Sequence, residues 1–203
     1  MTPTLNPATT AVILIGYQND YFSPEGALFD VVKDSALKVM QNTMAVVEGL
    51  EDSPVTLIAT PILFTPDYSE LVEPIGILKL IKDSQAFRAD TAGGLPIAPI
   101  QAYGRRILEV PGKRGLNAFS NTRLLEVLRE RRITDVVLMG VVTSLCIEST
   151  GREAFEQGYR VIVIADATAG KSEFEQEYYC AEIFPMYATV MDHRTLLTQL
   201  GRG

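Results

Sequence analysis

The sequence predicts an α/β fold, a three-layer α-β-α sandwich with a mostly parallel six-stranded sheet. Three observations lead to this prediction: short apolar runs recur along the 203 residues, stretches with helical spacing separate them, and 47% of the residues are hydrophobic. A chain of this length and hydrophobicity is the size of one domain with an ample core. We therefore expect residues 1–203 to form a single domain.

The apolar runs are the expected strands. They are rich in Val, Ile and Leu, and they are too short for typical helices, which favours strands buried on both faces. They cover residues 11–16, 55–60, 106–111, 135–141, 159–165 and 187–191.

The stretches between the runs are the expected helices. They cover residues 34–50, 121–132, 144–158 and 172–184, with Asn121 and Ser172 as candidate N-caps. Alternating strands and helices predict βαβ units, and therefore parallel strands. Residues 85–104 are irregular, and we expect them to form a loop over a substrate pocket.

The charge and the rare residue types exclude several functions. A net charge of -7, with scattered Lys and Arg, argues against nucleic-acid and membrane partners. The N-terminus has no basic leader and no apolar run could span a bilayer, so we expect a cytoplasmic protein. With His193 as the single histidine, we expect no metal site and no cofactor, and a structural or surface role for that residue.

Two residues at predicted strand ends carry the candidate chemistry. Ligands of parallel sheets bind beyond the carboxyl ends of the strands. Cys146 follows the run at 135–141 and opens a helix, where free N–H groups and the helix dipole favour a thiolate. Lys113 follows the run at 106–111, and a cation beside a thiol stabilises negative charge. A lone cysteine such as Cys146 is more often an inert buried residue, and a lone lysine such as Lys113 is more often a solvated loop residue.

Together these residues resemble the isochorismatase-like cysteine hydrolases, a family that includes nicotinamidases, carbamoyl-amide hydrolases and isochorismatases. The resemblance extends over nearly the whole chain. It rests on three segments: AVILIGYQNDYF, KRGLNAFSNTRL and GVVTSLCIESTGREAFEQGYRVIVIADAT.

The resemblance implies a role for each site residue. Cys146 would be the nucleophile and Lys113 its electrostatic partner. The N–H groups of Val142 and Cys146 would form the oxyanion hole, beside a cis peptide bond at Val141-Val142. The expected substrate pocket is lined by Gln18, Phe22, Phe64, Thr143 and Tyr179.

One position departs from the family pattern. The family's third catalytic residue is an aspartate at the end of the first strand, where this chain has Gly16. Such an aspartate moves the thiol proton, which is typically worth about 10²- to 10⁴-fold in rate. We expect Asp20 to brace the loop, with a substitute-base role as the alternative. If the missing carboxylate limits the reaction, Gly16→Asp should raise turnover.

Three functions remain open. The first is hydrolysis of a small amide, imide or related C–N substrate through a thioester at Cys146. The second is vinyl-ether hydrolysis of the isochorismatase type, which relies on the aspartate that this chain lacks. The third is small-molecule binding by a catalytically impaired protein. The apolar segment at 71–81 further predicts a homo-oligomer.

Overall fold

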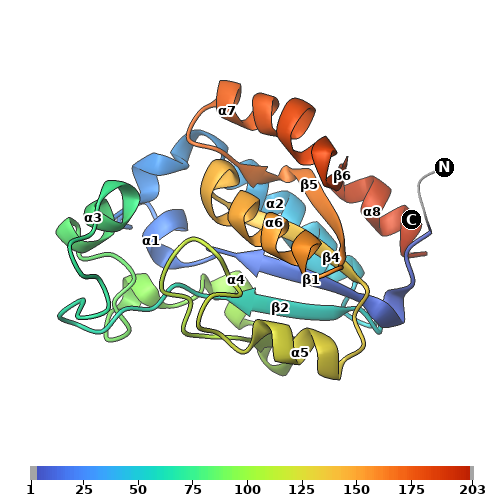
Figure 1. The fold of residues 1–203 in the computed structure, drawn as a ribbon, viewed down its shortest axis with the longest axis horizontal. Coiled ribbons are helices and arrows are strands. Elements are labelled where there is room, and N and C mark those ends of the chain that lie inside the picture. Colours follow the sequence, from blue (N-terminus) through green and yellow to red (C-terminus); the bar gives the residue numbers. More distant parts are fainter. Residues whose placement is uncertain (1–3, 202–203) are drawn as a thin grey trace.

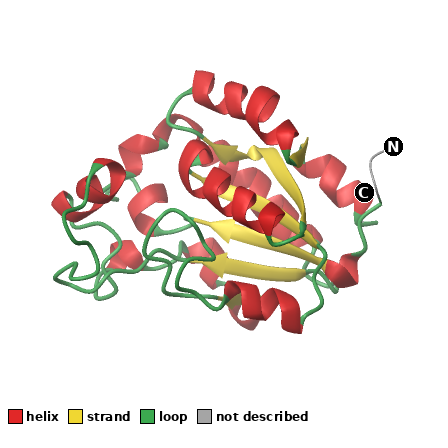
Figure 2. Cartoon of the chain, in the orientation of Figure 1, coloured by secondary structure: helices red, strands yellow, loops and turns green. Residues whose placement is uncertain are grey.

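Six parallel strands form one sheet at the centre of the computed structural model, which describes residues 4–201 (Figures 1 and 2). The spatial order of the strands is β3-β2-β1-β4-β5-β6. Their bounds are Thr10–Ile15 for β1, Thr56–Thr60 for β2, Ile107–Glu109 for β3, Asp135–Val141 for β4, Arg160–Ala169 for β5 and Ala188–Met191 for β6. All six predicted strands are confirmed, and so is the predicted α/β fold.

The central strands form the core because they are apolar after their first residues, Thr10 in β1 and Asp135 in β4. Every residue of β1 is buried, and so is every residue of β4. The two strands pair in parallel, with Ile15 opposite Gly140. A side chain on Gly140 would meet the Ile15 carbonyl oxygen at 1.9 Å. Glycine there therefore lets the ends of β1 and β4 approach each other.

Helices cover both faces of the sheet (Figure 1). Helices α5 and α6 lie on one face, and α2 and α8, which contact each other, lie on the opposite face. The bounds are Asn19–Phe22 for α1, Lys33–Gly49 for α2, Gly76–Asp83 for α3, Ala98–Gln101 for α4, Leu124–Glu130 for α5, Glu148–Glu156 for α6, Glu173–Tyr178 for α7 and His193–Gln199 for α8. Single turns of 3-10 helix occur at Pro7–Thr9, Phe29–Val31, Ala92–Gly94, Gly104–Arg106 and Phe184–Met186, and π-helical turns at Thr143–Ile147 and Tyr179–Ile183.

The helices agree only in part with the sequence prediction. The short helices α1, α3 and α4 and the last helix, α8, were not predicted. Ser172 caps α7, as predicted, by accepting a hydrogen bond from the Glu175 N–H. The predicted cap at Asn121 is wrong, because Asn121 has a left-handed φ of 58° and the Thr122 hydroxyl accepts the N–H of Leu124 instead.

The connections at the carboxyl edge of the sheet build the candidate site. Helices α1 and α3 lie beyond the arrowheads of β1 and β2 in Figure 1. The irregular region at 85–104 returns to this edge, where Pro96 bridges to Gln18 and Arg88 bridges to Phe64. Within residues 4–201, the structure contains no helix with the length and apolar character needed to cross a membrane.

Candidate active site

Lys113 and Cys146 are in contact at the carboxyl edge of the sheet. The Lys113 Nζ atom lies 3.3 Å from Cys146 Sγ, and it also donates a hydrogen bond of 2.5 Å to the Gly115 carbonyl. Lys113 is completely buried and Cys146 is 2% exposed. The two residues that the sequence singles out, 33 positions apart, therefore form one buried polar pair.

Backbone pairing holds Lys113 in this position. The segment that follows β3 continues alongside the segment that follows β2, with Lys113 bridged in parallel to Ile62. The Leu63 N–H donates to the Lys113 carbonyl at 3.1 Å. The lysine backbone is thus fixed by the sheet extension, and its ammonium contacts Cys146 in the turn after β4.

Cys146 lies in a π-helical turn, Thr143–Ile147, between β4 and α6. The peptide bond that precedes this turn, Val141-Val142, is cis. Two side chains of α7 hold the turn from outside: Gln176 accepts the Thr143 hydroxyl at 2.5 Å, and Glu175 accepts the Ser144 N–H at 3.3 Å. The sequence alone placed the cysteine in the first turn of an α-helix; the structure shows a wider turn.

Gly16 directly follows β1 in a backbone conformation that favours glycine. Its φ is 77°, and an added Cβ would lie 2.8 Å from the Val141 carbonyl oxygen and 3.1 Å from Val141 Cγ2. L-residues rarely adopt such a φ. The backbone at position 16 and the end of β4 are therefore packed together without room for a side chain.

Tyr21 fills the space next to Gly16. Its Cδ2 would lie 3.4 Å from a Cβ at position 16, and its ring packs on Phe87 with centroids 4.9 Å apart. Burial raises the pKa of Tyr21 well above its usual value, and the negative charges of Cys146 and Asp20 add to this effect. The phenol therefore keeps its proton, and it faces the same site as Cys146.

Asp20 braces the loop, as the sequence predicts. One carboxylate oxygen accepts the Phe87 N–H at 2.6 Å, and the other accepts the Ala27 N–H at 3.2 Å. The residue is 6% exposed. Both oxygens are thus bound to backbone donors that lie far apart in the sequence.

The five expected pocket residues have different environments. The Gln18 amide donates to the carbonyls of Ile62 and Gly94, each at 2.7 Å, and accepts the Ile62 N–H at 2.7 Å. Both of its N–H donors are therefore occupied by the backbone. Thr143 and Phe64 are buried, the former bound to Gln176 and the latter packed on Tyr68. Phe22 and Tyr179 are half-buried.

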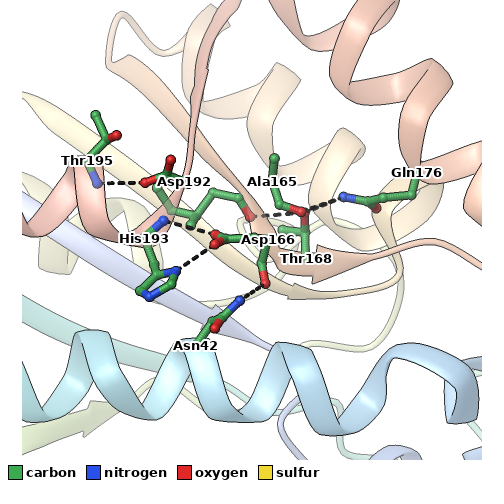
Figure 3. A network of polar contacts seen from close by, with 9 residues as sticks. Asn42, Ala165, Asp166, Thr168, Gln176, Asp192, His193 and Thr195 are labelled. Atoms are coloured by element: carbon green, nitrogen blue, oxygen red, sulfur yellow. Dashed lines mark hydrogen bonds and ion pairs between the residues drawn. The ribbon is translucent and has the colours of Figure 1, made fainter.

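His193 contacts Asp166 in the polar network drawn in Figure 3. The ring Nδ1 atom of His193 lies 2.6 Å from one Asp166 carboxylate oxygen, and the backbone N–H of His193 donates to the other oxygen at 2.9 Å. The Asn42 amide, from α2, donates to the Asp166 carbonyl at 2.6 Å. These contacts tie α8 and α2 to β5, which is a structural role. A cavity of about 500 Å³ borders this network, lined among others by Asp166, Thr168 and Gln176.

Three side chains of the site were not predicted from the sequence. Tyr21 follows the recognised QND segment, and Glu175 and Gln176 are polar residues in the first turn of a predicted helix. Their positions after the ends of predicted strands could have marked them as candidate site residues. Their placement near the Cys146 turn, however, depends on the fold. Within residues 4–201, no group of three or more His, Cys, Asp or Glu is arranged to hold a metal ion.

The chain matches known proteins over most of its length. The model of the isochorismatase domain matches residues 10–195. The chain belongs to the isochorismatase family. Family members among the curated relatives include ureidoacrylate amidohydrolase RutB of Caulobacter vibrioides, which is 31% identical over a 220-residue alignment that covers 98% of this chain and 96% of RutB. A match to Nicotinamidase 3 of Arabidopsis thaliana is 45% identical but spans only 33% of that relative's length.

Solved structures of isochorismatase-like proteins share the fold. A cysteine hydrolase from Pseudomonas syringae pv. phaseolicola superimposes with a TM-score of 0.87 at 24% identity, covering 98% of this chain and 95% of that one. An N-carbamoylsarcosine amidase from Thermoplasma acidophilum gives a TM-score of 0.73 at 22% identity, covering 91% and 96%. These structures share the sheet and helix layers of this chain. The family match and the RutB relative place the chain in a family of hydrolases.

Proposed function

We propose that the protein hydrolyses a C–N bond of a small amide, imide or related substrate through a thioester at Cys146. The observation that carries this proposal is the buried contact between Lys113 Nζ and Cys146 Sγ at the carboxyl edge of the sheet. A thiol beside a cation is an activated nucleophile, whereas an isolated buried cysteine is inert.

The geometry of the turn supports the remaining roles. Thr143–Ile147 opens the segment that leads into α6, and the N–H groups of Leu145 and Ile147 within it both donate to the Val142 carbonyl. We assign the oxyanion hole to the N–H groups of Val142 and Cys146, which would stabilise the tetrahedral intermediate. We assign the pocket lining to Gln18, Phe22, Phe64, Thr143 and Tyr179, of which Phe22 and Tyr179 are half-buried and the other three are buried.

The relatives favour C–N bond hydrolysis. The name of the RutB relative describes an amidohydrolase of ureidoacrylate, and it aligns with almost the whole chain. An N-carbamoylated or ureido acid is therefore the first substrate class to test. Vinyl-ether hydrolysis is a weaker candidate, because protonation of the ether needs an acid and Gly16 offers no side chain in the place of the family's aspartate.

The test is substrate turnover by the purified protein. A panel of ureido acids, N-carbamoyl amino acids, nicotinamide and cyclic imides should yield at least one substrate that is hydrolysed, detected as released ammonia or amine or, for a cyclic imide, as the ring-opened amide acid. The Cys146→Ser variant should lose this turnover by about a thousandfold or more. If no substrate is turned over and the parent binds panel members tightly, the protein is the catalytically impaired binder instead.

We further infer a homo-oligomer with a cytoplasmic location. Val72 and Ile75 are 85% and 83% exposed in the single chain, at the start of the apolar segment that leads into α3. Such exposure favours a contact with a second copy of the chain. Cys146 and Cys180 are both free thiols, which suits a reducing compartment.

A further inference from the structure

In the part of the chain that the structure describes, the hydrogen-bond partners of the Lys113 ammonium are a backbone carbonyl and a thiol. Within residues 4–201, none of the ion pairs includes Lys113, and its recorded partners are the Gly115 carbonyl and Cys146 Sγ. Burying an uncompensated cation is costly. The group in contact with it that can become an anion is the Cys146 thiol.

The other titratable groups near Cys146 are unsuited to carry its proton. Asp20 is bound to the N–H groups of Phe87 and Ala27. Glu175, which reaches the Cys146 turn, uses one oxygen for the Ser144 N–H and the other for the Lys171 N–H. Tyr21 keeps its proton, because burial raises its pKa well above the usual value. Lys113 remains as the group in direct contact with the sulfur.

We infer that Cys146 and Lys113 form a self-sufficient thiolate–ammonium pair, in which Lys113 is the proton carrier of the reaction as well as the cation beside the sulfur. This inference rests on the proposed function. It follows from the 3.3 Å contact, the complete burial of Lys113 and the missing carboxylate partner. The reaction then needs no carboxylate after β1, so glycine at position 16 is compatible with an active enzyme.

The proton balance closes with these two residues and water. The Cys146 thiolate attacks the substrate carbonyl carbon, and the C–S bond forms while the carbonyl oxygen takes the electron pair. When that pair returns, the C–N bond breaks and the leaving nitrogen takes a proton from the Lys113 ammonium. The neutral Lys113 amine then removes a proton from the water that attacks the thioester. Collapse of this second intermediate releases the carboxylic acid and restores the thiolate beside the ammonium.

The test separates the charge of Lys113 from its proton. Lys113→Arg keeps a cation, but a guanidinium does not release its proton near neutral pH. Lys113→Met removes both the charge and the proton. We compare three rates for each variant: alkylation of Cys146 by iodoacetamide, burst acylation by p-nitrophenyl acetate, whose leaving group needs no proton, and amide turnover.

We expect Lys113→Arg to retain alkylation and burst acylation within about threefold while amide turnover falls by about 10²- to 10⁴-fold. Lys113→Met should lose all three. Amide turnover at the parent rate by Lys113→Arg, or alkylation at the parent rate by Lys113→Met, would overturn the inference. Circular dichroism and thermal melting show which variants fold.

A second measurement covers the case in which the larger guanidinium does not fit. Ethylammonium added to Lys113→Ala should restore amide turnover by about tenfold or more, because it can both hold and release a proton, and guanidinium should not. Equal rescue by the two cations would show that charge alone matters. If Glu175→Gln loses amide turnover but keeps alkylation, Glu175 is the proton carrier and the assignment to Lys113 is wrong.

The two proposals fail in different ways. If the parent protein turns over no amide and forms no acyl-enzyme, the proposed function fails, and the alkylation rates still decide whether the ion pair exists. If the parent turns over amides and Lys113→Arg does so equally well, the function stands and the proton-carrier role falls.

Discussion

The carbonyl oxygen of Val141 lies 2.8 Å from the point that a side-chain carbon on Gly16 would occupy. This relationship joins the end of β1 to the residue that enters the Cys146 turn. From the sequence alone, a carboxylate at position 16 would be expected to restore a missing catalytic group. In the structure, the same carboxylate would first have to displace the β4 backbone and Tyr21.

We therefore predict that Gly16→Asp destabilises the protein and does not raise amide turnover. Gly16→Ala should lower the free energy of unfolding by about 1 to 3 kcal/mol, from left-handed strain together with the close contact. Gly158→Ala is the matched control, because Gly158 has a φ of 89° but nothing within 4 Å of an added Cβ. Urea unfolding measures all three variants. A Gly16→Asp enzyme that is stable and more than about tenfold faster would revive the missing-base account.

Cys146 should be alkylated faster than Cys180 at neutral pH. Burial raises the pKa of the Cys180 thiol to about 11, whereas Cys146 contacts the Lys113 ammonium. Because the thiolate is the reactive form, we expect a rate ratio of about tenfold or more. Mass spectrometry after timed iodoacetamide labelling gives both rates from one sample, and Cys180→Ser checks the assignment. Faster labelling of Cys180 would remove the main support for nucleophilic catalysis.

Asp20→Ala should destabilise the fold rather than stop the chemistry. The substitution leaves the N–H groups of Phe87 and Ala27 without their acceptor, so the unfolding free energy should fall by about 1 to 3 kcal/mol. Asp67→Ala is the control, because the exposed Asp67 accepts hydrogen bonds from its near neighbours Thr65 and Ser69. This substitution should change the unfolding free energy little. Amide turnover per folded molecule should stay within about threefold of the parent. A hundredfold loss at unchanged stability would make Asp20 the substitute base.

Stability should fall as the solution becomes alkaline. Burial raises the pKa of Tyr68 to about 12, and that of Tyr21 well above its usual value. In the unfolded chain, tyrosine loses its proton at a pH of about 10. Above that pH, the folded state therefore holds protons that the unfolded state has given up. The contribution of these tyrosines to the free energy of unfolding is complete below a pH of about 10, and it is lost as the pH rises toward their pKa values in the folded state. Urea unfolding across this range should show a shallower decline for Tyr21→Phe.

The exposed apolar residues before α3 should mediate self-association. Light scattering at micromolar concentration should give a mass above that of one chain. Val72→Glu combined with Ile75→Glu should lower it, because two charges would be buried in the contact. Leu37→Glu, at another exposed apolar position on α2, is the control for non-specific effects. A monomeric parent would contradict the prediction.

The sequence determined the sheet and the two residues at its carboxyl edge. Runs such as 11–15 and 136–141 are apolar throughout, which is typical of strands covered on both faces, so the strands could be located without tertiary information. The parallel arrangement then placed Cys146 and Lys113 at one edge, because the ends of parallel strands meet there. Ser172 was also predictable, since capping depends on the next three residues.

Tertiary structure decided how that edge works. The lack of room for a side chain on Gly16 depends on the position of Val141. The Gln18 amide is occupied because it binds the carbonyls of Ile62 and Gly94. The contact of His193 depends on Asp166, and each of these partners comes from a distant segment. The isolation of the Lys113 charge likewise depends on which carboxylates the fold places near it. Local periodicity carries no information about such partners. Hydrogen bonds and charge balance in the site arise between segments that only the packed sheet and its loops bring together.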